Sequence, residues 1–298
     1  MASQDVLTPP DEIVASTWAG ERQGGGTRIL LFVALCILGL FSFLPFYFLL
    51  TTSIKEAGEA NRVPLTFIPQ SFSLEHFEFV INEGAPRAMA NGLFYAGVGT
   101  VLAVVVSALI GYVVVKHRSV VGNILFWTIV ASSLMPLASY IVTMVTLLQR
   151  ITNITGIPML DTFQGLLLPR IVYAFGVFLM RQAMLAVPDE LLDAAKVDGA
   201  GFLRSFWQIA LPVVRPQTIT LAILIFMGLF GEFLWPLVAT STREMQVASV
   251  WLASRSFGYG VNPGVLSAGA LIVIFPMLIV FLLGQRYITA GLGMTGFR

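Results

Sequence analysis

The chain has 298 residues, of which 57% are hydrophobic and 11% are charged, and its formal net charge is +1. Its mean hydropathy is +0.86. This composition excludes an ordinary soluble protein and a basic nucleic-acid surface, while the single cysteine excludes an internal disulfide and the two histidines give no metal-binding spacing.

Residues 1–28 form a polar tail before the first apolar run begins at Ile29. The tail contains acidic residues such as Asp5 and Glu21. A cleavable signal peptide instead has a short basic region followed by a short apolar run. We therefore expect a retained first membrane span behind a cytoplasmic N-terminal tail.

Six apolar stretches are each long enough to cross a bilayer core of roughly 30 Å. Backbone polar groups in lipid must be satisfied within the segment, so the stretches predict helices and an all-α integral membrane fold. The transmembrane domain is expected over residues 29–288, with a cytoplasmic tail at 289–298. The predicted spans are Ile29–Leu50, Gly92–Val115, Asn123–Leu148, Phe163–Met184, Thr218–Val238 and Val265–Leu283.

The distribution of basic residues predicts the orientation of these spans. With the N-terminus inside, ten of the 17 Lys and Arg side chains fall on the cytoplasmic side. Lys116 and Arg118 lie in the very short connection between the second and third spans. The pattern favours a multi-pass protein with both termini in the cytoplasm.

Glu232 and Arg170 are charged residues inside predicted spans, where charge is costly and indicates function. Glu232 in the fifth span is either a pathway or gate residue facing a central cavity, or an interfacial acid bonded to a neighbouring helix. Arg170 in the fourth span pairs with Glu232 if the two helices adjoin, or snorkels to the outer interface.

The third predicted span is unusually polar and has Pro136 near its middle. Its hydroxyl groups suit a path for a sugar, and helix packing in membranes uses the same groups. Both interpretations stay open. The residues are Ser132, Ser133, Ser139, Tyr140 and Thr143.

Aromatic residues follow the fifth span on its outer side. Trp235 and Pro236 indicate an interface anchor and a kink. The loop Ala239–Pro263, with Trp251 and Tyr259, is a candidate contact for an extracellular solute-binding protein, or else a loop folded back on the helices.

The connection over residues 188–216 has the pattern of a helix rather than a loop. Pro188, Asp189 and Glu190 are typical of a helix start. Apolar and small residues then recur at three- and four-residue steps, which predicts one helix or two short helices bent near Gly199 and Gly201. This segment is compatible with a helix lying on the membrane surface and with a docking helix for a soluble partner.

The same segment resembles the cytoplasmic EAA loop of ABC importer permeases. The match falls on Asp193-Ala194-Ala195, Gly199, Ile209 and Leu211-Pro212, with Asp198-Gly199-Ala200 as the extended form. Asp193 stands where the family usually has Glu. The resemblance implies that residues 189–208 are a coupling helix seated in a groove of an ATPase. The residues that it implies in coupling are Asp193, Ala194, Ala195, Asp198, Gly199, Phe202, Ile209, Leu211 and Pro212.

Further segments resemble the carbohydrate-uptake branch of this family, the maltose and glycerol-3-phosphate type. They are the residues from Phe175 to Gln182 and from Glu232 to Leu237, together with the end of the chain from Gln285 to Leu292. The resemblance covers about residues 27–298. It implies a transport path for a sugar or sugar-like solute, with Glu232, Ser139, Tyr140 and Thr143 as path candidates.

The chain has no Gly-x4-Gly-Lys-Ser/Thr phosphate-binding loop, so it is not expected to be an ATPase or another enzyme. It is expected to hold no cofactor, with ATP and Mg²⁺ on a partner subunit. The resemblance implies cytoplasmic ATP-binding subunits, an extracytoplasmic solute-binding protein and a second permease, with a heterodimer favoured, in a prokaryotic plasma membrane.

Three alternatives differ in cargo or energy source. The same machine could carry a polyamine or a phosphorylated polyol. A secondary transporter driven by an ion gradient would favour an internal two-fold repeat and midplane ion-binding groups, for which Glu232 is the one candidate. A membrane-embedded enzyme would need a cluster of catalytic side chains, and no predicted span contains one.

Overall fold

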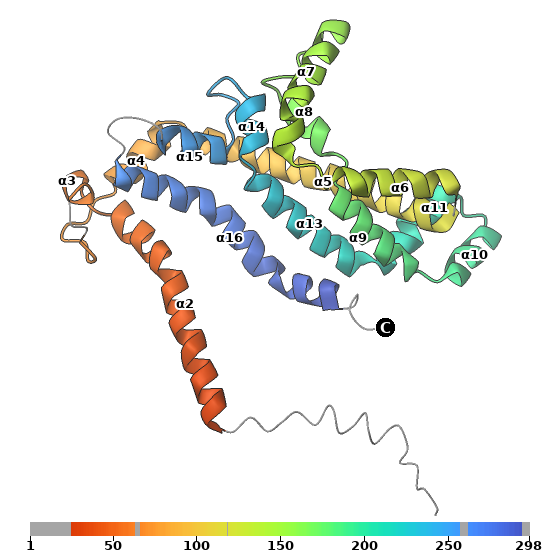
Figure 1. Ribbon diagram of the computed structural model, residues 1–298, viewed down its shortest axis with the longest axis horizontal. Helices are drawn as coiled ribbons and strands as arrows, with labels where there is room; N and C mark the ends of the chain where they lie inside the picture. The colour runs from red at the N-terminus through yellow and green to blue at the C-terminus, as the bar shows by residue number, and fades with distance from the viewer. Residues whose placement is uncertain (1–24, 63–65, 118, 257–261, 294–298) are drawn as a thin grey trace, which may run out of the picture. The chain divides into compact units, whose positions relative to one another are not determined.

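The structure is a computed structural model that describes residues 25–62, 66–117, 119–256 and 262–293. It divides into two units, Met1–Leu49 and Leu50–Arg298. The described residues of the first unit are 25–49, and they belong to helix α2 (Gly25–Ser53). All regular elements among the described residues are helices, labelled as in Figure 1.

Helix α5 (Ala85–His117) is the central element of the second unit (Figure 1). It packs most extensively against α9 (Ala174–Leu185) and α13 (Arg215–Phe230), and α13 in turn packs against α16 (Pro263–Gly293). Small residues let these helices approach closely, as is usual in membranes. A Cβ atom placed on Gly111 of α5 would lie 2.8 Å from the backbone of Met180 and Arg181 on α9.

The third predicted span is two helices, α6 (Val120–Ser132) and α7 (Leu137–Thr155), bent by 111°. Pro136 has no backbone N–H and cannot continue a helix from α6. The hydroxyls of Ser132 and Ser133 donate to the carbonyls of Ile129 and Val130, both at 2.6 Å. Such bonds from side chain to backbone favour a bend at this point.

The fourth predicted span is also bent, by 47°. It contains α8 (Phe163–Leu167), the short 3₁₀ helix η1 (Leu168–Arg170) and α9. Arg170 therefore lies at the break and not inside a continuous helix.

The fifth predicted span, Thr218–Val238, is wrong at its C-terminal end. Helix α13 ends at Phe230, and the separate α14 (Leu234–Ala239) follows. The ring of Pro236 would clash with the carbonyl of Glu232 in a continuous helix. That carbonyl instead accepts a hydrogen bond from the hydroxyl of Ser249, at 2.7 Å.

Three described helices are long and apolar enough to cross a membrane, and three bent pairs bring the total to six if each pair is one span. The third pair joins Phe202–Val213 to α13 with a bend of 84°. Its first arm contains α11 (Phe202–Ser205), the π-helical turn η2 (Phe206–Ala210) and α12 (Leu211–Val213). The first, second and sixth predicted spans lie within α2, α5 and α16.

Four short helices complete the described fold. They are α3 (Ala57–Ala60), α4 (Glu75–Asn82), α10 (Asp189–Val197) and α15 (Ala248–Ser256). The predicted N-terminal tail lies largely outside the described residues, as do Phe257, Tyr259 and the last five residues of the C-terminal tail.

Candidate functional site

Helix α10 begins and ends with well-defined local signals. Pro188 precedes it, and Asp189 and Glu190 occupy its first turn. At its end the N–H of Gly199 donates to the carbonyl of Lys196 at 3.0 Å, and the N–H of Ala200 donates to that of Ala195 at 2.8 Å. These two bonds form a Schellman motif. The segment is therefore two helices, α10 and α11, separated by a short turn.

Gly199 has a backbone reason for being glycine. Its φ is +77°, a left-handed conformation that side chains with a Cβ seldom adopt. A Cβ at this position would meet no atom of the chain within 4 Å. Within this chain, the backbone conformation and not lack of space requires the glycine.

The residues matched to the EAA pattern do not share one face. Asp193, Ala194, Asp198 and Gly199 are exposed, whereas Ala195 is buried with only 7% of its surface accessible. Ile209 and Leu211 pack against the core, and Phe202 and Pro212 are exposed. A partner can thus touch part of the set directly, while the other residues fix the segment to the helices behind it.

Several exposed apolar residues of this segment are not part of the pattern, and two of them are exposed the most. Val197 is 88% exposed at the end of α10, and Leu203 is 60% exposed on α11. Their apolar character could have drawn attention to them, because a charged or polar residue would serve better at a solvated helix end.

The C-terminal end of α5 holds the α10–α11 segment in place. The ammonium group of Lys116 donates to Asp189 Oδ1 at 2.6 Å and to the Val187 carbonyl at 2.7 Å. The ring of Phe202 lies 5.2 Å from that of Tyr112 and 5.3 Å from that of His117. A cavity of about 440 Å³ lies between these groups.

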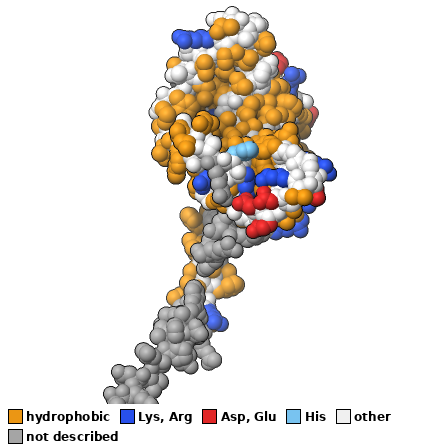
Figure 2. All heavy atoms as spheres, turned by 90° about the vertical axis from the view of Figure 1, so that its right-hand side faces the viewer, with side chains coloured by type: hydrophobic (Ala, Val, Ile, Leu, Met, Phe, Trp, Pro, Cys, Tyr) orange, Lys and Arg blue, Asp and Glu red, His pale blue; other side chains and the backbone are white. Residues whose placement is uncertain are grey.

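The exposed side of α10 carries paired charges. Lys196 and Asp193 form an ion pair at 2.9 Å. The hydrogen bond from Lys196 to Asp193, and the attraction between their charges, raise the pKa of Lys196 above its ordinary value. Figure 2, which faces the end of the unit that carries α10 and α11, shows acidic and basic side chains gathered side by side.

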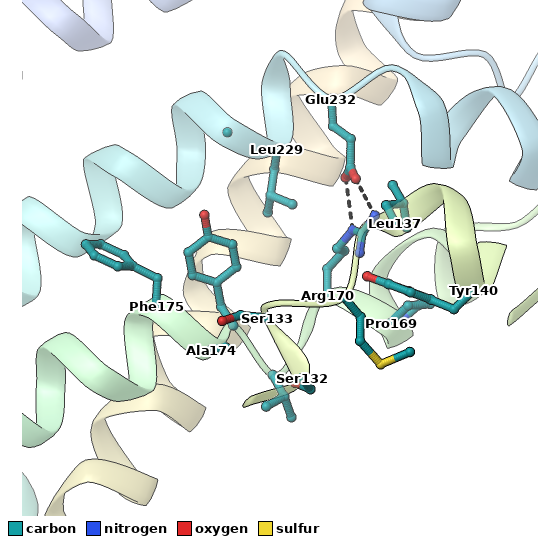
Figure 3. A pocket seen from close by; sticks show the side chains of 14 residues that line it. Ser132, Ser133, Leu137, Tyr140, Pro169, Arg170, Ala174, Phe175, Leu229 and Glu232 are labelled. Carbon is teal, nitrogen blue, oxygen red and sulfur yellow. Dashed lines mark hydrogen bonds and ion pairs between the residues drawn. The ribbon is translucent and has the colours of Figure 1, made fainter. Parts of the chain in front are cut away.

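A second site lies where the breaks in the fourth and fifth predicted spans meet. The Arg170 guanidinium binds the Glu232 carboxylate through both nitrogen atoms that face it, with Nε 3.0 Å from Oε2 (Figure 3). The Tyr95 hydroxyl donates to the same Oε2 at 2.6 Å. Arg170 therefore pairs with Glu232 and does not snorkel, and the carboxylate is bonded to two neighbouring helices.

The ion pair lies at the edge of a cavity of about 630 Å³ (Figure 3). Hydroxyl groups and aromatic rings form much of the wall. The polar lining residues are Ser132, Ser133, Tyr140, Arg170, Tyr173 and Glu232. The cavity combines these polar groups with a larger apolar wall, and its size suits a small solute.

The structure brings together only some of the predicted path residues. Tyr140 and Glu232 line the cavity. Ser139 and Thr143 are exposed on α7 and are not part of its lining. Tyr95 and Tyr173 were not predicted, because no sequence spacing relates them to Glu232.

Trp235 is not the interface anchor that its position predicted. It is fully buried, and its indole N–H donates to the Leu166 carbonyl at 3.1 Å. Trp251 of the outer loop is also buried, and its N–H donates to the Glu83 carbonyl at 3.1 Å. The described part of this loop is folded onto the helices.

Asp161 ties two connecting segments together, the one before α8 and the one after α14. Its carboxylate accepts from the backbone N–H groups of Ser241 and Thr242, at 2.8 and 3.1 Å. Partial burial acts to raise the pKa of Asp161, but these hydrogen bonds outweigh it and hold the pKa below its ordinary value. Among the described residues no group of three or more His, Cys, Asp or Glu could hold a metal ion.

Comparisons with known proteins agree with this arrangement. Residues 99–292 match the family described as "Binding-protein-dependent transport system inner membrane component". The chain is 31% identical over 275 residues to the arabinooligosaccharides transport system permease protein AraQ of Bacillus subtilis strain 168, covering 91% of this chain and 96% of the relative. It is 32% identical over 276 residues to the sn-glycerol-3-phosphate transport system permease protein UgpE of Yersinia enterocolitica, covering 90% and 96%.

One solved structure shares the fold. It is a bacterial ABC transporter involved in the import of the acidic polysaccharide alginate, with a TM-score of 0.75 and 21% identity over 89% of this chain and 98% of that one. The family match covers more than half of the chain, and the relatives match nearly all of it. The chain therefore belongs to the inner membrane components of binding-protein-dependent transport systems and is a multi-pass transport permease subunit, not an enzyme.

Proposed function

We propose that this chain forms one half of the membrane path of an ATP-driven importer for a sugar or sugar-like solute. An extracytoplasmic binding protein delivers the solute, and a second, related permease completes the path as a heterodimer. Cytoplasmic ATP-binding subunits hold ATP and Mg²⁺ and receive the α10–α11 segment. Both termini then lie in the cytoplasm of a prokaryotic cell.

The observation that carries this proposal is the construction of the α10–α11 segment. It lies next to the apolar spans, α10 ends in a Schellman motif, and the first residue of α10 is fixed to α5 through Lys116. It also exposes Asp193, Ala194 and Val197. A rigid helix that is held from behind and exposed in front suits a contact that transmits force from a soluble subunit.

The cavity supports a neutral, hydroxyl-rich cargo. Arg170 is the one cation in the described lining, and Glu232 neutralises it. Serine and tyrosine hydroxyls can donate to and accept from a polyol. An anionic solute would find no unpaired cation in this lining, and it would have to lose its hydration without a charged partner.

A phosphorylated polyol is the second candidate, and the similarity to a glycerol-3-phosphate permease favours it. The two candidates differ in charge. The uptake of a labelled arabino-oligosaccharide can therefore be compared with that of sn-glycerol-3-phosphate in cells that depend on this system. The neutral cavity predicts that the oligosaccharide is the better substrate.

The assembly is tested by purifying the intact complex through a tag on this chain and identifying the proteins that accompany it. We expect an ATPase with a phosphate-binding loop, a second permease and a solute-binding protein. Purification of the chain without any ATPase, under conditions where its membrane domain stays folded, would contradict the proposal.

A further inference from the structure

We infer that α5 transmits movement from the α10–α11 segment, here named the coupling segment, to the cavity. Lys116 and Tyr95 are the positioning residues at its two attachment points. The inference rests on the proposed function. It adds a route through the molecule and assigns roles to two residues outside the EAA pattern.

The attachment to the coupling segment is direct. Lys116 binds both the first residue of α10, Asp189, and the carbonyl of Val187 just before it. The Lys116 side chain is only 12% exposed, so water screens this ion pair less than a surface pair. The Phe202 ring rests against Tyr112, one turn earlier on the same helix. Hence α5 holds both arms of the segment.

The attachment to the cavity is equally direct. Tyr95 is fully buried, and its hydroxyl donates to Glu232 at 2.6 Å. The same carboxylate holds Arg170. Any displacement of Tyr95 along the axis of α5 must therefore lengthen this bond or move the ion pair that lines the cavity.

The helix between the two attachments is continuous. Lys116 follows Tyr95 by 21 residues, which corresponds to about 30 Å along an α-helix. No proline interrupts α5 after Pro86. The close contact of Gly111 with the α9 backbone keeps the helix seated along its length.

The alternative route along the chain is interrupted. From α10 it passes the turn at Gly199, the π-helical η2 and the bend of 84° before α13, and only then reaches Glu232. Bends and π-helical turns absorb movement, whereas an unbroken helix transfers it. Force applied at α10 therefore reaches the cavity more directly through α5.

The experiment reports on the cavity without the need for a known solute. Cys36, the only cysteine, is replaced by serine, and Ser133, an exposed lining residue, is changed by Ser133→Cys. The complete complex with its partners is placed in vesicles. The rate of labelling by a membrane-impermeant maleimide is measured with and without a non-hydrolysable ATP analogue. The readout is the ratio of the two rates.

We expect the nucleotide to change the labelling rate in the reference complex. Lys116→Met, Asp189→Asn and Tyr95→Phe should each reduce this response by about fivefold or more, as for the loss of a typical coupling free energy. Lys116→Arg keeps the cation and should retain the response. Because the two residues act through one helix, the double variant Lys116→Met with Tyr95→Phe should lose no more of the nucleotide response than the single variant with the larger effect.

Two results would overturn this inference and leave the proposed function in place. One is a full nucleotide response in correctly assembled Lys116→Met and Tyr95→Phe complexes. The other is a double variant whose loss is the product of the two single losses, because independent routes multiply. A reference complex whose labelling ignores the nucleotide would overturn the proposed function, and this inference with it.

Discussion

Arg170 and Glu232 are charged side chains at two breaks between apolar helices, and each satisfies the other. Their side chains are 13% and 17% exposed. The pair costs desolvation energy on both sides, and this cost is offset only while both partners and the Tyr95 hydroxyl are present. The pair also joins the breaks that follow η1 and α13.

Removing one partner of the ion pair is expected to destabilise the protein more than removing the charge from both partners. Arg170→Met leaves the Glu232 carboxylate buried without its cation, at a cost of about 3–5 kcal/mol. Adding Glu232→Gln removes that charge and keeps an acceptor for Tyr95. The unfolding temperature of the purified protein should be lower for Arg170→Met than for the double variant. If the double variant lost as much unfolding temperature as Arg170→Met or more, the cost of an unpaired Glu232 carboxylate would not explain the effect.

Gly199 allows a test that separates backbone conformation from space. A bulky side chain such as Leu would hold a partner surface away, and a β-branched residue such as Val is also strained at a φ of +77°. Asn adds a side chain but tolerates this conformation.

We expect Gly199→Leu to insert normally, and the complex that contains it to hydrolyse ATP through its ATP-binding subunits with little solute uptake. If the backbone conformation is the reason for the glycine, Gly199→Asn should keep most of the coupling between hydrolysis and uptake, and Gly199→Val should lose it. Hydrolysis and uptake are measured in the same vesicles. Normal uptake by Gly199→Leu would refute a coupling role for this position.

Asp161 gives the contact between its own segment and the segment at Ser241 and Thr242 a dependence on pH with a defined sign. Its pKa in the folded protein is below its ordinary value of about 3.8, so its stabilising effect is complete above that value. The effect is lost as the pH falls through the ordinary value and then through the lower folded value. The Asp161 side chain is only partly buried, so the effect is modest.

Asp161→Asn is therefore expected to destabilise the protein at pH 7, and the difference from the unchanged protein should shrink below about pH 4. Unfolding temperatures of both proteins measured across this range give the comparison. A difference that is the same at pH 7 and at pH 3 would show that the carboxylate charge is not involved.

At the scale of the elements, hydropathy and proline together predicted most of the helices but not their geometry. Apolar length identified α2, α5 and α16, because those helices are unbroken over the span. The third span was predicted as one helix, and its break lies at Pro136 and the neighbouring serines. The bend of 111° depends on how α7 packs, which no local pattern contains.

The candidate sites were predicted unevenly for the same reason. The EAA pattern is local, so Gly199 and its neighbours could be found from spacing. The pairing of Arg170 with Glu232 joins residues 62 positions apart, and the sequence left it open against snorkelling. The burial of Ala195 agrees with the apolar periodicity of its helix, whereas the burial of Trp235 follows from tertiary contacts that its position along the span does not reveal.

The packing of α5 against α9 offers a comparison within one helix. Gly111→Ala places a methyl group 2.8 Å from the α9 backbone, which cannot move aside cheaply, and should cost about 1–3 kcal/mol. Gly97→Ala on the same helix meets nothing within 4 Å, and should be neutral or stabilising by up to about 1 kcal/mol. Unfolding temperatures test both. Equal effects of the two changes would show that the close approach of α5 and α9 is not required.

At the scale of the whole molecule, the described residues form a cavity, and the sequence contains no Gly-x4-Gly-Lys-Ser/Thr phosphate-binding loop. The α10–α11 segment contacts the C-terminal end of α5, whereas Tyr95, which bonds Glu232 at the cavity, lies 21 residues before Lys116 on the same helix. A pump of this kind needs a partner that binds nucleotide. A secondary transporter would instead draw its energy from an ion gradient.

The most direct test is the energy source of transport in vesicles that contain the complete complex. With the binding protein and a labelled arabino-oligosaccharide on the outside, we predict uptake that requires ATP on the inside and that persists when ionophores abolish all ion gradients. Uptake that proceeds without ATP and stops when the ion gradient is removed would contradict the account.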